Sequence, residues 1–135
     1  MSTDDEQHLK LLAIFHYLVG ALAVLFACFP LIHVGLGAMM LFSPEMMGGN
    51  DPRNQPPPEF VGWLFVTIGA IFFLVGQSIA VSIILCGRYL AKRKNYLFIF
   101  VIAAVQCMFM PFGTVLGIFT IIVLSKESVK KLFGR

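Results

Sequence analysis

The sequence predicts an all-α fold: an integral membrane helical bundle with about four transmembrane segments, in a single membrane domain over residues 1–135. Composition points to it first, because 59% of the residues are hydrophobic and 13% are charged, against about 25% charged in soluble domains. The distribution of charge is the second observation. All Asp, Glu, Lys and Arg residues lie in four short stretches, which are 1–10, 43–60, 87–95 and 125–135. The apolar runs between these stretches are the predicted spans.

The first predicted span covers residues 9–42. Its charge-free part, 11–42, would form about 48 Å of straight helix, which is more than one upright crossing needs and less than two. Pro30 lies inside it, and a helical proline removes one backbone donor and crowds the carbonyl of Phe26, four residues back. We therefore predict one crossing that is kinked at Pro30. A crossing followed by a short re-entrant piece, which would place the N-terminus outside, is the alternative.

The second predicted span covers residues 60–86, which include no Asp, Glu, Lys, Arg or His. These 27 residues would form about 40 Å of helix, enough to cross a bilayer core of about 30 Å with some tilt. The preceding loop, residues 43–59, contains the runs GGNDP (48–52) and PPP (56–58), which break helices and form turns. We expect this loop to be a connector.

The basic residues predict the orientation. Lys and Arg close to span ends are retained in the cytoplasm, so the loop 87–95 and the tail 126–135 should be cytoplasmic and the loop 43–59 exoplasmic. We expect a multi-pass protein of the cell inner membrane, with anionic lipid headgroups as partners of the basic loop and tail. Nucleic acid is not an expected partner, because the cations flank apolar spans and have no interleaved aromatic residues on a soluble surface.

The last apolar run is interrupted by Pro111 and Gly113. Because the chain on both sides of this run is expected in the cytoplasm, the run must cross twice or re-enter. We predict two short spans, 96–110 and 113–125, that form a hairpin at Pro111–Gly113. The tail is expected to continue as a short helix at the membrane interface.

The hairpin region resembles a family of membrane proteins. An aromatic residue after the basic loop is followed by an apolar stretch and then by PFGTVLGIFT, residues 111–120, closing on Val123-Leu124-Ser125. This pattern resembles the signature of an uncharacterised family of small multi-span bacterial membrane proteins with a C-terminal P-F-G-T-x-L-G-I-F-T type motif. The resemblance covers residues 87–135 and implies a bacterial multi-span protein, with no functional residue to transfer. The sequence departs from the many relatives that have Trp between Thr120 and Leu124.

Small residues recur at spacings that let two helices approach closely. Residues seven apart lie on one helix face, and small residues there allow backbone contact. The candidate packing residues are Ala13, Gly20 and Ala27 in the first span, Gly62, Gly69 and Gly76 in the second, and Gly113 and Gly117 in the last. We expect the first two series to dock antiparallel within one chain. A seam between copies in an oligomer is the alternative.

Three polar side chains, His16, Gln77 and Gln106, are expected inside the membrane. Ionisable groups there suggest function. On one helix His16 and His33 would be about 25 Å apart, so they could share one metal ion only if the chain reverses between them. We expect neutral histidines that bond to a freed carbonyl near Pro30 or lie near the interface. Gln77 and Gln106 fall at similar depths, so a hydrogen bond between them would join two spans.

Methionines suggest a candidate metal site. Thioether sulfur selects Cu(I), and under the predicted topology six methionines lie at the exoplasmic face, with one histidine not far in depth. The candidate ligands are Met39, Met40, Met46, Met47, Met108, Met110 and His33. Methionine also fills helix interfaces, and we favour that interpretation. We therefore expect no metal and no other cofactor.

The expected function is that of a small structural or interaction protein, either an accessory subunit or a self-associating scaffold. We do not expect an enzyme and name no catalytic residue, because no carboxylate lies within the spans and neither a Ser-His-Asp set nor a phosphate-binding glycine loop is present. An oligomeric pore lined by residues such as Gln77, Ser78 and Ser82 is one alternative. Cu(I) binding through the exoplasmic methionines is the other.

Overall fold

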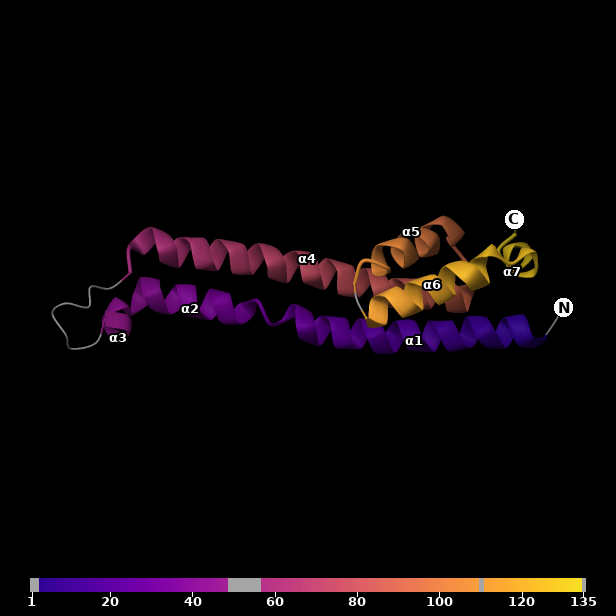
Figure 1. Cartoon of the computed structure of the whole chain (residues 1–135), viewed down its shortest axis with the longest axis horizontal. Coiled ribbons are helices and arrows are strands. Elements are labelled where there is room, and N and C mark those ends of the chain that lie inside the picture. The colour runs from indigo at the N-terminus through magenta and orange to yellow at the C-terminus, as the bar shows by residue number, and fades with distance from the viewer. Residues whose placement is uncertain (1–2, 49–56, 110, 135) are drawn as a thin grey trace. The chain divides into compact units, whose positions relative to one another are not determined.

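The computed structural model describes residues 3–48, 57–109 and 111–134, which form helices and no strand (Figure 1). The all-α class predicted from the sequence is confirmed. The helices are α1 (Thr3–Ala27), α2 (Leu31–Phe42), α3 (Pro44–Gly48), α4 (Glu59–Lys92), α5 (Tyr96–Gln106), α6 (Phe112–Ser125) and α7 (Glu127–Leu132). Residues 49–56 of the predicted loop 43–59 and the candidate ligand Met110 lie outside the described residues.

Two helical segments are long and apolar enough to cross a membrane. They are Asp4–Phe42, which comprises α1 and α2, and Glu59–Lys92, which is α4. The α5 and α6 helices are also apolar but have only 11 and 14 residues. They measure about 16 and 21 Å, less than a bilayer core of about 30 Å. The described chain thus has two membrane-length segments and two shorter apolar helices, and the four crossings stay a prediction.

The helix of the first apolar run is interrupted at Pro30. The α1 helix ends at Ala27 and α2 begins at Leu31. In the turn between them, the amides of Cys28 and Phe29 bond to carbonyls three residues back, at 3.1 and 3.0 Å. Proline has no N–H and cannot continue the ladder of four-residue bonds. The sequence predicted a kink within one helix, and the structure has a turn between two helices at that residue.

The chain separates into two compact units. The central unit, residues 24–78, contains the end of α1, all of α2 and α3, and the first part of α4. The terminal unit, residues 1–23 and 79–135, contains the start of α1, the rest of α4, and α5 to α7.

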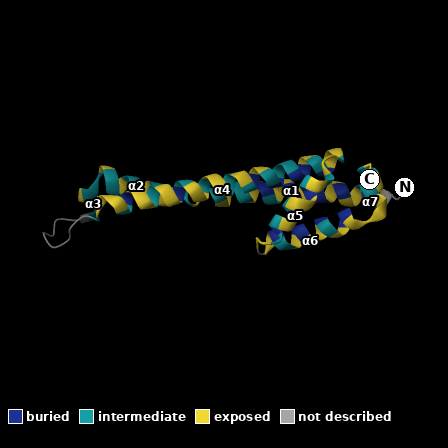
Figure 2. Cartoon of the chain, turned by 90° about the horizontal axis from the view of Figure 1, so that it is seen from above, coloured by how far each residue is buried: buried dark blue, intermediate teal, exposed yellow. Residues whose placement is uncertain are grey.

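The hydrophobic core of the described residues belongs to the terminal unit, where α5 packs on α6 and α6 on α7 (Figure 2). Its members come from every helix of that unit, and they are Leu9, Leu12, Ala13, Cys86, Leu90, Ile99, Leu116, Val123, Leu124 and Val129. The Tyr96 hydroxyl donates to the Leu124 carbonyl at 3.0 Å and joins the start of α5 to the end of α6. Helices as short as α5 and α6 are not stable alone. The packing of α5 on α6 and of α6 on α7 therefore stabilises the hairpin.

The chain reverses between α4 and α5 within three residues. Arg93 and Asn95 have positive φ angles of 52° and 53°, a left-handed conformation that is uncommon outside glycine. The amide of Lys94 donates back to the carbonyl of Tyr89 at 3.0 Å and closes the end of α4. This tight turn reverses the chain so that α5 packs within the terminal unit, against α6.

Candidate functional site

The most specific feature of the central unit is a series of close backbone contacts between α2 and α4. A Cβ atom added at Gly37 would lie 2.7 Å from the Gly62 carbonyl oxygen and 2.8 Å from the Val66 nitrogen. One added at Gly69 would lie 3.0 Å from both the Pro30 oxygen and the Val34 nitrogen. Real Cβ atoms essentially never lie under 3.0 Å from backbone atoms, so only glycine fits at Gly37. At Gly69 an added Cβ would force its neighbours to shift by a few tenths of an ångström.

Of the two sevenfold series that were expected to dock on each other, only Ala27 and Gly76 meet in the central unit, and Gly62 and Gly69 contact other residues. Gly62 lies against Leu41, Gly69 against Val34, and Gly76 against Ala27, whose Cβ would be 3.0 Å from an added one. Val34 and Leu41 continue the spacing of Ala27 by seven residues. In the central unit, the two helices therefore pack antiparallel through one face of each.

Two residues at close helix contacts were missed from the sequence, Gly37 in the central unit and Gly87 in the terminal unit. Gly37 falls outside the sevenfold series, and its only signal is the neighbouring glycine of the GLG stretch, Gly35, which has nothing within 4 Å of an added Cβ. Gly87 lies at the end of the second span. An added Cβ there would lie 3.0 Å from the Ala13 oxygen and 3.1 Å from the His16 Cβ, within the terminal unit.

The other predicted packing residues lie in contacts of the terminal unit. Gly20 packs against Ile84 and Ile83 of α4. In the hairpin, an added Cβ at Gly117 would lie 2.5 Å from the Ala103 oxygen, and one at Gly113 would lie 2.7 Å from the Gln106 oxygen. These contacts let α5 and α6 approach to backbone distance.

Gln77 lies beside the interruption of the first helix. Its side-chain amide donates to the Val24 carbonyl at 3.4 Å and to the Cys28 sulfur at 3.5 Å. The Cys28 thiol in turn donates to the same carbonyl at 3.3 Å. Within the central unit, Gln77 thus ties α4 to the last turn of α1, next to the backbone that Pro30 leaves without regular helix bonds.

Replacement of Gln77 by Leu is expected to destabilise the central unit by about 0.6 kcal/mol, the average worth of one hydrogen bond between membrane helices. Thr67→Val, at an exposed position of the same helix, removes a polar group without this bond and serves as the control. The free energy of unfolding in detergent micelles, followed by the fluorescence of the single tryptophan, Trp63, measures the difference. Equal stabilities for the two variants would mean that the Gln77 hydrogen bond does not stabilise the central unit.

His16 and Gln106 form a polar pair in the core of the terminal unit. Both are buried, at 0% and 1% exposure. His16 Nδ1 lies 2.8 Å from the Leu12 carbonyl oxygen; since a carbonyl only accepts, we assign the proton to Nδ1. The Gln106 side chain interacts with the His16 ring, although His16 Nε2 and both Gln106 amide atoms lack a well-aligned hydrogen-bond partner among the described residues. The sequence had paired Gln106 with Gln77, and the structure gives each a neighbour of its own.

Ion pairs tie the N-terminus to the basic parts of the terminal unit. Arg93 Nη2 donates to Glu6 Oε1 at 2.7 Å, and Lys126 Nζ lies 3.6 Å from Asp5 Oδ1. Arg93 belongs to the turn after α4, and Lys126 to the link between α6 and α7. The start of α1, the basic turn and the C-terminal tail therefore lie at one end of this unit.

The tail carries a third ion pair. Lys130 Nζ donates to Glu127 Oε1 at 3.0 Å within α7. This hydrogen bond and the charge of Lys130 lower the pKa of the Glu127 carboxyl, and the same contact raises the pKa of Lys130. Both side chains are in water, so the pair contributes little to stability. It does keep the two groups charged over a wide pH range.

The described candidate metal ligands belong to both units, with His33 and four methionines in the central unit and Met108 in the terminal unit. His33 is exposed on α2, stacks on Phe65 at 6.1 Å between ring centres, and lines a pocket of about 270 Å³ with Pro30, Ile68, Gly69 and Phe72. Four of the candidate methionines, Met39, Met40, Met46 and Met47, belong to the same central unit. Among the described residues, no group of three or more His, Cys, Asp or Glu side chains lies together.

The chain matches no protein-family model, no curated protein and no solved structure. Its function is therefore inferred from the residues and contacts described above.

Proposed function

We propose that this chain is a small integral protein of a bacterial inner membrane that acts as a structural or interaction protein, as an accessory subunit or by self-association. The main support is the low burial of its two membrane-length apolar segments. In the most apolar 18-residue windows of Asp4–Phe42 and Glu59–Lys92, only 28% and 17% of the residues are buried. A core helix of a soluble protein would be mostly buried, whereas a helix in lipid needs no cover.

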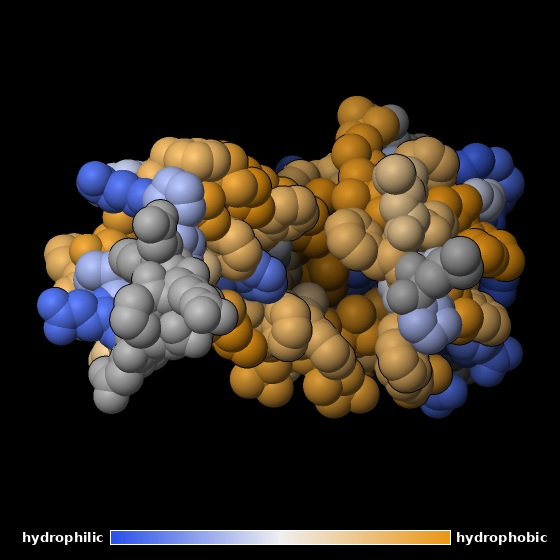
Figure 3. Space-filling view, turned by 60° about the vertical axis from the view of Figure 1, so that its left-hand side comes forward, coloured by the Kyte–Doolittle hydropathy of each residue, from blue (hydrophilic) through white to orange (hydrophobic). Residues whose placement is uncertain are grey.

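The exposed surface agrees with this placement. On the face shown in Figure 3, hydrophobic residues cover most of the coloured surface, and hydrophilic residues form smaller groups. Large phenylalanine side chains are prominent among the exposed residues, including Phe26, Phe29, Phe42, Phe60, Phe72 and Phe112. Exposed apolar area of this extent marks a surface that meets lipid or another protein.

The proposed topology has Asp4–Phe42 and α4 crossing the membrane in opposite directions, with the short α5–α6 hairpin as the third and fourth segments. The ion pairs of Glu6 and Asp5 support a cytoplasmic N-terminus, because they place it beside the basic turn and tail. Lys and Arg residues at those two places favour the cytoplasm. The C-terminus would then be cytoplasmic as well.

A structural or interaction role fits the contacts of the glycines and of the polar residues within the helices, because these contacts stabilise the fold. The glycines at helix contacts support the fold itself, and Gln77 bonds within the central unit. Ser78, another residue of the pore alternative, donates to the Leu74 carbonyl of its own helix at 2.8 Å. These contacts favour a packed bundle over a polar pore, and the apolar exterior remains as the surface for partners.

Native mass spectrometry of the protein released from membrane-derived nanodiscs tests the proposal. We expect either a discrete homo-oligomer or a protein partner at fixed stoichiometry, because the exterior is built for contacts within the membrane. A lone monomer, with no partner recovered by pull-down after mild solubilisation, would contradict the proposed function. The same spectra show bound metal, and one copper ion per chain would favour the methionine alternative.

A further inference from the structure

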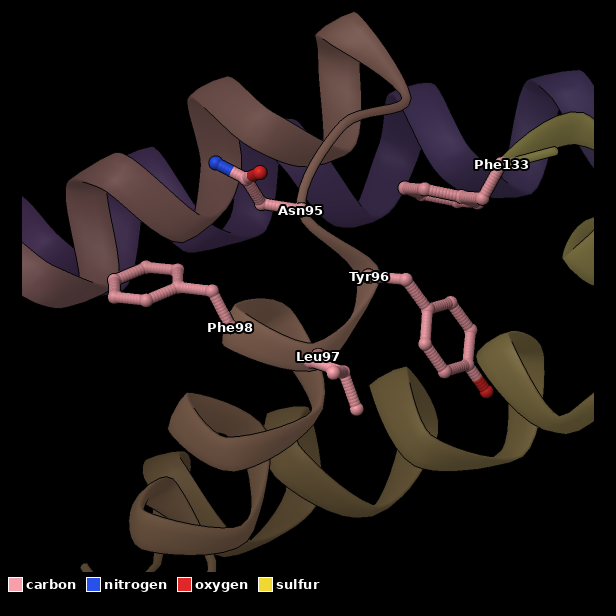
Figure 4. Close-up of a pocket in the computed structure, with 5 residues that line it drawn as sticks. All are labelled: Asn95, Tyr96, Leu97, Phe98 and Phe133. Carbon is pink, nitrogen blue, oxygen red and sulfur yellow. The ribbon is translucent and has the colours of Figure 1, made fainter. Parts of the chain in front are cut away.

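A pocket opens beside the turn between α4 and α5 in the terminal unit. It has a volume of about 340 Å³, and its lining residues are Asn95, Tyr96, Leu97, Phe98 and Phe133. Figure 4 shows Asn95 at the turn, Leu97 and Phe98 on the first turn of α5, and Phe133 at the end of the tail helix. Two aromatic contacts support the walls: Phe98 meets Tyr89 edge to face at 5.4 Å, and Phe133 meets Tyr96 at 5.7 Å. The pocket lining thus combines aliphatic and aromatic side chains with one side-chain amide.

Basic residues lie next to the pocket-lining residues along the chain. Lys94 directly precedes Asn95, while Lys130 and Lys131 come just before Phe133 in the last turn of α7. Lys130 interacts electrostatically with Tyr96 and is paired with Glu127. Lys94 and Lys131 are exposed and form no ion pair with the carboxylates of the described residues. Lys94 and Lys131 lie one and two residues along the chain from lining residues, and Lys131 also interacts with Glu127. These two exposed lysines are therefore the candidate cations for an anion bound at the pocket.

We propose that this pocket seats one phospholipid with an anionic headgroup. The lipid phosphate would bind Lys94, Lys131 and the Asn95 amide, and the first part of an acyl chain would lie along Leu97 and Phe98. The inference rests on the membrane placement proposed above, which puts this turn at the level of the headgroups. Charge complementarity selects an anionic lipid, and the apolar walls select a molecule with a hydrocarbon part.

Nanodiscs made from equal amounts of phosphatidylglycerol and phosphatidylcholine, with the same acyl chains, provide the test. We expect native mass spectrometry of the released protein to show one retained phosphatidylglycerol per chain. Each basic residue at a membrane surface contributes roughly fivefold to binding of anionic lipid. The double variant Lys94→Gln/Lys131→Gln is therefore expected to lower the retained phosphatidylglycerol, relative to phosphatidylcholine, by about thirtyfold.

The matched control is the double variant Lys10→Gln/Arg88→Gln. It removes the same charge from exposed positions of α1 and α4 in the same unit, neither of which lines the pocket, and it should retain the lipid. Equal retention of the two lipids by the unchanged protein would overturn the proposal, as would an equal loss in both double variants. In either case the membrane placement would stand. Release of the protein from the discs without any retained lipid would also overturn the lipid seat, whereas failure of the protein to insert into the discs would refute the membrane placement.

Discussion

Gly37→Ala is expected to destabilise the central unit by about 1–3 kcal/mol, the usual cost of adding a methyl group to a packed interior. The new Cβ would lie 2.7 Å from the Gly62 carbonyl oxygen and 2.8 Å from the Val66 nitrogen. Both are backbone atoms of α4, so no side-chain rotation relieves the contact. The two helices would have to separate, and the neighbouring contacts at Gly62 and Gly69 would loosen with them.

Gly35→Ala provides the matched control in the same helix. An added Cβ at Gly35 meets nothing within 4 Å, and alanine stabilises a helix by roughly 0.5–1 kcal/mol relative to glycine. The same chemical change two residues away is therefore expected to have the opposite sign. This pair separates the loss of a helix contact from any general effect of alanine on helix formation.

Unfolding in mixed detergent micelles measures both variants. Trp63 is the only tryptophan and follows Gly62 on α4, so its fluorescence reports on the contact that Gly37 makes. Circular dichroism of the same samples reports on helix content. If Gly37→Ala proves as stable as Gly35→Ala, the close approach of α2 and α4 is not a feature of the folded protein.

Much of the fold follows from the positions of charged and small residues. The helix class and the membrane-length segments are visible as apolar runs between charge clusters. The predicted basic loop 87–95 is wrong in extent, because α4 continues to Lys92 and leaves only residues 93–95 between α4 and α5. A long apolar run has few alternatives to a helix, because a backbone in lipid must satisfy its own hydrogen bonds. The interruption of the first run also falls at Pro30, the residue without an N–H.

The contact partners of individual residues were harder to predict from the sequence. Gly37 lies three residues after Val34 and four before Leu41, so it shares their helix face. A search for sevenfold repeats of small residues alone does not find it. Depth along a helix placed Gln77 and Gln106 together, but depth does not say which face a side chain occupies. Gln77 bonds to Val24 and Cys28 on one side of α4, while Gln106 packs with His16 in the terminal unit. Rotation about the helix axis decided these pairings.

A cysteine at Gln7 is expected to react with a membrane-impermeant maleimide from the same side of the membrane as a cysteine at Lys94. A cysteine at Met46, an exposed residue of α3, is expected to react only from the opposite side. The difference in labelling between the two sides is expected to be close to all or none, because the reagent does not pass the bilayer. Intact cells and opened membranes, labelled in parallel, distinguish the two sides.

The expected pattern follows from the ion pairs of the terminal unit. Glu6 Oε1 lies 2.7 Å from Arg93 Nη2, and an ion pair of this length cannot form across a bilayer core of about 30 Å. Each partly exposed pair contributes only about 0.2–1 kcal/mol to stability. The side of the membrane on which the N-terminus lies is therefore inferred from the short distance of the pair and not from its strength. Gln7 and Lys94 must then share one face of the membrane.

The competing topology for the first apolar run predicts a different result. If this run crossed once and then re-entered, the N-terminus would lie outside, and the cysteine at Gln7 would react from the same side as the one at Met46. The ion pairs with Arg93 and Lys126 could not form in that arrangement. The unchanged chain gives the labelling background, because its three cysteines lie within or at the ends of apolar segments. Labelling of Gln7 and Met46 from one side would thus refute both the single crossing and the clustering of charges at one end of the terminal unit.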